Sequence, residues 1–171
     1  MQQSKDLLMT SLSKFYICKP NIEKIVPIIN GKSEISLRLL DWFVTNYSKK
    51  TVTNITIGEE SINVYLSYRS QLKAYSKQQF DPFRRRDRIT FYFDKDEFVE
   101  TTIGQLNFFR WVIQNNILEY ILENIKDIEV DMFSMQKKCS LDKGKKKRIE
   151  LTKSFVKNMN VFEGTRTMSF S

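Results

Sequence analysis

Residues 101–116 read Thr-Thr-Ile-Gly-Gln-Leu-Asn-Phe-Phe-Arg-Trp-Val-Ile-Gln-Asn-Asn. Thr102 and Gln105 have the spacing of a capping box, in which two side chains satisfy backbone N–H groups that the first helical turn leaves unpaired. The apolar residues behind them recur at helical spacing, with two aromatic residues beside the stripe: Ile103, Leu106, Phe109 and Ile113, then Phe108 and Trp111. Asn115-Asn116 closes the pattern. The stretch therefore predicts a capped amphipathic helix that packs into the core.

The segment that follows keeps the helical period. Its apolar positions share one face: Ile117, Ile121, Ile125, Ile128 and Met132. Its acidic positions share the opposite face: Glu119, Glu123, Asp127 and Asp131. This arrangement predicts a second amphipathic helix over residues 117–132 with a solvated acidic face.

Two segments upstream alternate with a period of two and predict β-hairpins. Residues 88–93 turn back through Asp94-Lys-Asp-Glu97 into residues 98–100. Residues 53–57 turn back through Gly58-Glu59-Glu60 into a second strand, for which we favour an end at Tyr68. A helix over 70–79 would follow, and a single helix over 62–80 is the competing interpretation. Asp81-Pro82 ends this helix in either case.

The first fifty residues favour helices. Ser4 can cap a helix to about Tyr16, and residues 21–29 form a shorter piece interrupted by Pro27. Ser33 then caps a third helix, which runs from Glu34 to about Ser48. Together the patterns predict an α+β fold with a helical N-terminal segment, a small antiparallel sheet of two hairpins and two amphipathic helices.

The length of 171 residues indicates one domain, whose core can bury roughly 70% of the unfolded surface. We place this domain at residues 1–136. From residue 137 the composition becomes strongly basic and poor in apolar residues, which predicts a flexible C-terminal arm and tail over 137–171.

The composition excludes much of enzyme chemistry. The chain contains no histidine, so Ser-His-Asp and Cys-His catalysis and histidine metal sites are ruled out. Cys18 and Cys139 have no CxxC spacing, so neither a zinc ribbon nor a redox dithiol is indicated, and partly buried reduced thiols are expected. The N-terminal residues have no secretory pattern, and no apolar stretch reaches the length of a membrane span. We expect an intracellular protein that does not engage a membrane.

Charge changes sign twice along the second half of the chain. Residues 69–88 hold seven basic and two acidic residues, a net charge of +5. Residues 89–131 hold three and nine, a net of −6, and residues 137–157 hold nine and two, a net of +7. The whole chain carries a formal charge of +8. Two basic segments of this kind favour an anionic partner.

The first basic segment, residues 73–88, interleaves cations with aromatic residues. Arginine offers multidentate donors to phosphate, and tyrosine can stack on unpaired bases. We predict a nucleic-acid-binding set here: Lys73, Tyr75, Lys77, Arg84, Arg85, Arg86, Arg88 and Tyr92. In the alternative, the arginines pair with the acidic helices. Phe80 and Phe83 are expected to be core residues.

The second basic segment reads Lys-Gly-Lys-Lys-Lys-Arg over residues 143–148. These cations repel one another and must be exposed, so the segment is typical of a nucleic-acid arm or a nuclear localisation signal. All five cations belong to the predicted set: Lys143, Lys145, Lys146, Lys147 and Arg148. A solubilising tail is the alternative.

One acidic cluster, Asp94-x-Asp96-Glu97, has the composition of a Mg²⁺ or Mn²⁺ site. Aspartates are also favoured in hairpin turns for local hydrogen bonding, and no second cluster or phosphate-binding loop accompanies this one. A solvated turn is the preferred interpretation, with no metal, no cofactor and no catalytic residue.

The stretches 68–89 and 101–111 resemble an uncharacterised protein family of the nucleocytoplasmic large DNA viruses. The resemblance covers about residues 40–121, with a looser similarity over 143–153. The family has no assigned activity, so the resemblance transfers no catalytic or binding residue. It implies a viral protein that is made in an infected cell and lies in the host cytoplasm or nucleus. Packaging in the virion is a further possibility that the resemblance leaves open.

The leading hypothesis from the sequence is a non-enzymatic, sequence-nonspecific nucleic-acid-binding protein that contacts phosphates of DNA or RNA. The alternative is a virion structural or scaffolding protein whose basic arm and tail dock onto neighbouring viral subunits.

Overall fold

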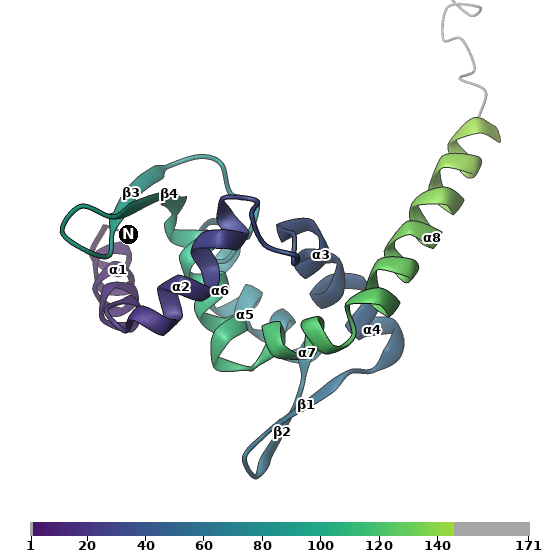
Figure 1. The fold of residues 1–171 in the computed structure, drawn as a ribbon, viewed down its shortest axis with the longest axis horizontal. Helices are drawn as coiled ribbons and strands as arrows, with labels where there is room; N and C mark the ends of the chain where they lie inside the picture. Colours follow the sequence, from purple (N-terminus) through teal and green to yellow (C-terminus); the bar gives the residue numbers. More distant parts are fainter. Residues whose placement is uncertain (1, 146–171) are drawn as a thin grey trace, which may run out of the picture. The chain divides into compact units, whose positions relative to one another are not determined.

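The computed structural model describes residues 2–145, and the side chains within residues 5–137 apart from residue 76. Contacts divide the chain into two units, with the boundary between Met135 and Gln136. Among the described residues, helices and two small antiparallel sheets coexist, so the predicted α+β class is confirmed (Figure 1).

The N-terminal helices are α1 (Gln2–Tyr16) and α2 (Lys19–Ile29). Ser4 lies inside α1, so its predicted role as the cap of this helix is wrong. Pro20 lies in the first turn of α2, where a backbone N–H would have no acceptor within the helix, so its absence is tolerated. Pro27 remains within α2 instead of interrupting it.

The third predicted helix begins later and is less regular than expected. It comprises α3 (Leu37–Trp42), the π-helical turn η1 (Phe43–Tyr47) and α4 (Ser48–Thr51). Ser36, not Ser33, is the N-cap, because its hydroxyl accepts from the Leu39 backbone N–H at 3.1 Å. Ser33 instead accepts from the N–H of Ile35.

The first hairpin consists of β1 (Asn54–Ile57) and β2 (Glu60–Asn63). The helix α5 (Val64–Gln79) starts directly after it, so the predicted strand to Tyr68 and the helix start at Ser70 are wrong. The physical reason is Asn63, whose Oδ1 accepts from the Leu66 N–H at 3.0 Å and caps the helix. Val64 and Tyr68 are buried one helical turn apart, whereas Leu66 points to solvent.

The second hairpin consists of β3 (Arg88–Tyr92) and β4 (Phe98–Thr102), paired from Arg88 opposite Thr102 to Tyr92 opposite Phe98. The two hairpins do not share a ladder, so the predicted single sheet is wrong. β3 and β4 lie beside α1, and β1 and β2 lie at a separate place below α7 (Figure 1). Each hairpin packs on helices instead of on the other hairpin.

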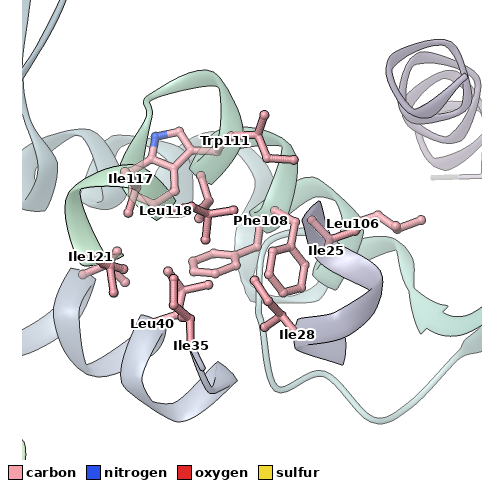
Figure 2. Close-up of a cluster of buried hydrophobic side chains, with 14 of the residues drawn as sticks. Ile25, Ile28, Ile35, Leu40, Leu106, Phe108, Trp111, Ile117, Leu118 and Ile121 are labelled. Carbon is pink, nitrogen blue, oxygen red and sulfur yellow. The ribbon is translucent and has the colours of Figure 1, made fainter. Parts of the chain in front are cut away.

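The helix α6 (Ile103–Gln114) is the predicted capped helix, and it is buried on more sides than an amphipathic stripe would require. Thr102 is confirmed as its N-cap, with the Gln105 N–H donating to Oγ1 at 3.2 Å. The buried apolar side chains are Leu106, Phe108, Phe109, Trp111, Val112 and Ile113. Figure 2 shows side chains of α2 and α3, among them Ile28 and Leu40, gathered with those of α6 and α7 in one core.

The helix predicted over 117–132 is two helices, α7 (Ile117–Glu123) and α8 (Ile125–Lys145). Asn124 separates them, and its N–H donates back to the carbonyls of Tyr120 and Ile121. Ile117, Ile121, Ile128 and Met132 are buried, so the apolar face predicted for this segment is present in spite of the break. The backbone of α8 is helical to Lys145, beyond the predicted start of a flexible arm at residue 137.

A carboxylate is partly buried next to this core. Burial raises the pKa of Asp41 to about 6, and the nearby charge of Asp81 acts in the same direction. The ordinary value is 3.8, so between these values the folded state holds more protons at Asp41 than the unfolded state. The stability contributed by this site therefore falls as the pH rises from 3.8 towards 6.

We expect Asp41→Asn to stabilise the protein by about 1 to 2 kcal/mol near neutral pH, because it removes a poorly solvated charge. The gain should become small at about pH 3.5, where Asp41 is protonated in the folded state and mostly protonated in the unfolded state. Urea denaturation of both proteins at the two pH values measures this difference. Asp6→Asn, the same substitution at an exposed residue of α1, is the control. An equal gain at both pH values would contradict the assignment.

Candidate nucleic-acid interface

The loop between α5 and β3, residues 80–87, carries the predicted arginines and is fixed at its start. Phe80 is the C-cap residue of α5 and is fully buried, which confirms its predicted core position. The N–H of Asp81 donates to the carbonyl of Gly104 at 3.3 Å. Oδ1 of Asp81 accepts from the N–H of Phe83 at 2.8 Å. The loop therefore leaves the core in a defined direction.

The first turns of α6 hold the same loop from the other side. Nε2 of Gln105 donates to the carbonyl of Pro82 at 2.9 Å, and Nδ2 of Asn107 donates to the carbonyl of Gln79 at 2.9 Å. Gly104 permits this approach, because a Cβ there would lie 3.1 Å from the carbonyl oxygen of Gln78. The side chain of Gln105 thus bonds to the loop. It does not complete a capping box, in which it would accept from the backbone N–H of Thr102.

Three of the predicted arginines line a cleft of about 570 Å³ between this loop, β4 and the end of α2. We call it the arginine cleft and define it by six lining residues: Phe83, Arg84, Arg85, Arg88, Phe98 and Glu100. Arg86 lies in an adjoining recess of about 30 Å³, which is also lined by Lys5 and Arg84. Arg84 separates the two hollows, so four basic side chains of one loop and strand lie around a single surface.

Two of these arginines are paired with carboxylates. Nη2 of Arg84 lies 2.8 Å from Oδ2 of Asp87, and Nη1 of Arg88 lies 3.5 Å from Oε2 of Glu100. The second pair is well exposed on both sides, so it contributes little to stability. The alternative predicted that the arginines pair with the acidic helices. The two carboxylate partners lie elsewhere, Asp87 in the loop and Glu100 in β4.

Arg85 and Arg86 are exposed, and no carboxylate within the described part of the chain lies within 4.0 Å of either guanidinium. The hydrogen bond from Arg84 lowers the pKa of Asp87, and the charges of Arg84, Lys5 and Arg86 add to this effect. The loop therefore has a positive local potential.

The aromatic residues of the predicted set differ in their availability. The ring of Tyr75 lies almost parallel to Phe80 at 6.3 Å, and its hydroxyl accepts from Arg110 at 3.3 Å. Tyr92 is 64% exposed on β3, with its ring 5.6 Å from that of Phe98. Tyr75 is therefore engaged inside the protein, whereas Tyr92 faces solvent near the cleft.

Phe83 departs from its predicted place in the core, since it is 43% exposed and lines the cleft. The cause is local: the Asp81 side chain and Pro82 turn the chain outward directly after Phe80. Phe98 was not part of the predicted set. Its pairing opposite Tyr92 across the hairpin is the sequence signal that could have placed it there.

The remaining predicted residues lie elsewhere. Lys73 and Lys77 are exposed one turn apart on α5 and do not line the cleft. Lys143 and Lys145 belong to the helical backbone of α8, with side chains outside the described set. Lys146, Lys147 and Arg148 lie outside the described residues.

The acidic cluster lies in the exposed turn between β3 and β4. Asp94 accepts from Lys19 at 2.9 Å and from the N–H of Lys95 at 2.8 Å. Within the described residues, no three side chains of metal-binding type come together. Cys18 is exposed, which corrects its expected partial burial. No helix in residues 2–145 is both long enough and apolar enough to cross a membrane.

A family model described as "Family of unknown function (DUF7197)" matches residues 1–166. The chain therefore belongs to this family. It is also 42% identical over 139 residues to an uncharacterised protein of Acanthamoeba polyphaga mimivirus. The match covers 76% of this chain and 54% of the relative, so the chain spans about half of that protein's length. No solved structure matches. The resemblance to a family of large DNA viruses is thus confirmed, and the chain is a viral protein.

The two stretches that carried this resemblance, residues 68–89 and 101–111, meet in space. The first contains the arginine loop, and the second contains the turns of α6 that hold it. Both stretches therefore contribute to the cleft and its support.

Proposed function

We propose that this protein binds nucleic acid without catalysing a reaction, and that it contacts phosphates through the arginine cleft and the neighbouring Arg86. The observation that carries the proposal is the pair Arg85 and Arg86, exposed and without a carboxylate within 4.0 Å in the described part of the chain. The backbone of the loop is anchored at its start, so little backbone freedom is lost there when a phosphate binds to these arginines. Contacts of this kind carry no base specificity, so we expect sequence-nonspecific binding.

Salt dependence is the signature of this mode of binding. If the four arginines of residues 84–88 neutralise four phosphates, affinity should fall roughly 100-fold between about 50 and 200 mM salt. The test is a fluorescence-anisotropy titration of the full chain with labelled DNA and RNA at several salt concentrations. Affinity that is absent at low salt, or unchanged by salt, would refute the proposal.

A double variant locates the binding surface. Arg85→Ala with Arg86→Ala should reduce the slope of log affinity against log salt by about 2, because two phosphate contacts are lost. Lys49→Ala with Lys126→Ala removes the same charge from exposed positions outside the cleft. This control should leave the slope nearly unchanged. Equal losses in both variants would show that net charge, and not the cleft, drives binding.

The basic residues 143–148 belong to the same proposal as a second source of affinity. Truncation after residue 136 should weaken binding to every nucleic acid by a similar factor and leave the dependence on Arg85 and Arg86 in place. We further propose that the protein acts in the cytoplasm or nucleus of the infected host cell, with nucleic acid as its partner there.

A role as a virion structural or scaffolding protein is the second candidate. Exposed apolar side chains on α7 and α8, namely Leu122, Val130 and Phe133, favour contact with another protein. In this case, Val130→Ser with Phe133→Ser would abolish association with viral structural proteins in nuclease-treated particle extracts. The Arg85 and Arg86 double variant would leave that association unchanged.

A further inference from the structure

We infer that the arginine cleft takes single-stranded nucleic acid, with one unpaired base seated against Phe83 and Phe98 and the flanking phosphates on Arg84, Arg85 and Arg88. This inference rests on the proposed function and specifies its ligand. It concerns the form of nucleic acid that fits the cleft, which phosphate contacts alone do not decide.

The first argument is the exposure of two phenylalanines at a polar site. Phe83 is 43% exposed and Phe98 is 55% exposed, and both line the arginine cleft. They come from different elements, the loop after α5 and the strand β4. Exposed aromatic rings are costly in water, and beside arginines they match the combination that binds unpaired bases by stacking.

The second argument is the alternation of ring and charge along the chain. Phe83 directly precedes Arg84 and Arg85, so a ring for a base and guanidinium groups for phosphates lie within three residues. On the opposite side, Phe98 lies two residues before Glu100, the partner of Arg88. The charged groups in the cleft are three arginines and one glutamate, a net charge of +2. This charge complements a phosphodiester backbone on each side of a base.

The third argument is size. The cleft volume of about 570 Å³ lies in the range of roughly 300–1,000 Å³ that is typical of sites for one small molecule. A nucleotide is of this class, whereas a duplex presents stacked and paired bases that cannot enter such a hollow. Double-stranded nucleic acid would reach only the arginines at the rim.

The fourth argument is that the backbone of both phenylalanines is fixed before a ligand arrives. The N–H of Phe83 donates to Asp81, and the preceding carbonyl of Pro82 accepts from Gln105. Phe98 lies opposite Tyr92 in the ladder of the hairpin, with the two rings 5.6 Å apart. Binding therefore requires little reordering of the backbone that carries the two rings.

The test compares three labelled ligands by fluorescence anisotropy with the full chain: a thymidine oligonucleotide, a duplex of equal length, and an abasic strand of equal charge. The single strand should bind roughly 10-fold more tightly than the duplex or the abasic strand, because only it offers a free base. Equal affinities for all three would overturn the inference.

The matched variants are Phe83→Leu and Phe98→Leu, which keep an apolar side chain and remove the aromatic face. Together they should weaken single-strand binding roughly 5- to 100-fold and leave duplex and abasic binding unchanged. Phe133→Leu changes an equally exposed phenylalanine on α8 and should have no effect. A double variant that binds the single strand as the unmodified chain does would overturn the inference.

The proposed function and this inference fail in different ways. If no ligand binds in a salt-dependent manner, the proposed function is wrong. If all three ligands bind equally and lose affinity in the Arg85 and Arg86 variant, the proposed function holds and the single-strand inference is wrong. Crosslinking with an iodouracil-containing strand provides a direct readout, because the adduct should map to Phe83 or Phe98.

Discussion

Phe80→Ala is expected to destabilise the protein by about 3 to 5 kcal/mol, the largest effect of any substitution considered. Phe80 is fully buried, and its ring lies among four other aromatic rings at centroid distances of 5.5–6.3 Å. These rings are Tyr68, Tyr75, Phe108 and Trp111. Alanine would leave a cavity between α5 and α6 that the surrounding rings cannot fill without leaving their own contacts.

Equilibrium denaturation in urea, followed by tryptophan fluorescence, measures this loss because Trp111 contacts the ring. Phe133→Ala removes the same side chain from a position that is 54% exposed, and it should cost less than about 1 kcal/mol. A similar cost for both variants would mean that Phe80 is not seated in the core. The start of the arginine loop would then lack the anchor described above.

Asn107→Ala is expected to destabilise the protein by about 2 to 3 kcal/mol. Asn107 is 1% exposed and makes two hydrogen bonds, one to α5 and one within α6. Its Nδ2 donates to the carbonyl of Gln79, and its Oδ1 accepts from Nη2 of Arg110 at 2.7 Å. Alanine would leave a carbonyl and part of a guanidinium without these partners in a largely dry environment.

The same denaturation experiment measures this cost, and Gln114→Ala, an exposed residue of the same helix, is the control. We expect Gln114→Ala to change stability by less than about 0.5 kcal/mol. A cost below about 1 kcal/mol for Asn107→Ala would show that water replaces the lost hydrogen bonds. Arg110 would still donate to Ser11 and Tyr75, so this variant tests the bonds of Asn107 and not the whole arginine network.

The sequence predicted elements best where a local signal and the packing agree. The Thr102 cap and the hairpin around Gly58 depend on short-range hydrogen bonding, and both are present. Asn63 and Asn124 were harder to interpret, because the same residue type can cap a helix, end one or sit in a strand. The π-helical turn at Phe43–Tyr47 has no sequence signature, since it depends on how this segment packs in the core.

The separation of the two hairpins could not be predicted from alternation. A period of two shows that a strand has two faces, but it does not show whether a sheet or a helix covers one of them. Here β4 leads directly into α6 and β2 leads directly into α5, and the two hairpins share no ladder.

The candidate site was predictable in its charges and less so in its aromatic residues. Arg84, Arg85 and Arg88 were identified from the sequence, and the fold brings them to one cleft. Tyr75 was included because it lies among the basic residues. Its position in the sequence does not show that Arg110 donates a hydrogen bond to its hydroxyl. Phe83 could be recognised only once its exposure was known, whereas the predicted hairpin already placed Phe98 opposite Tyr92.

The close approach of Gly104 to the chain at Gln78 has a consequence for how this surface can evolve. The loop is attached to α6 by the buried ring of Phe80 and by main-chain groups, namely the carbonyls of Gln79 and Pro82 and the amide of Asp81. Side chains at positions 84–86 take no part in that attachment. Their identities can therefore drift without disturbing the scaffold, so relatives could recognise different ligands with an unchanged backbone. Replacement of Gly104 would instead displace the backbone of the loop, whichever side chains stand at positions 84–86.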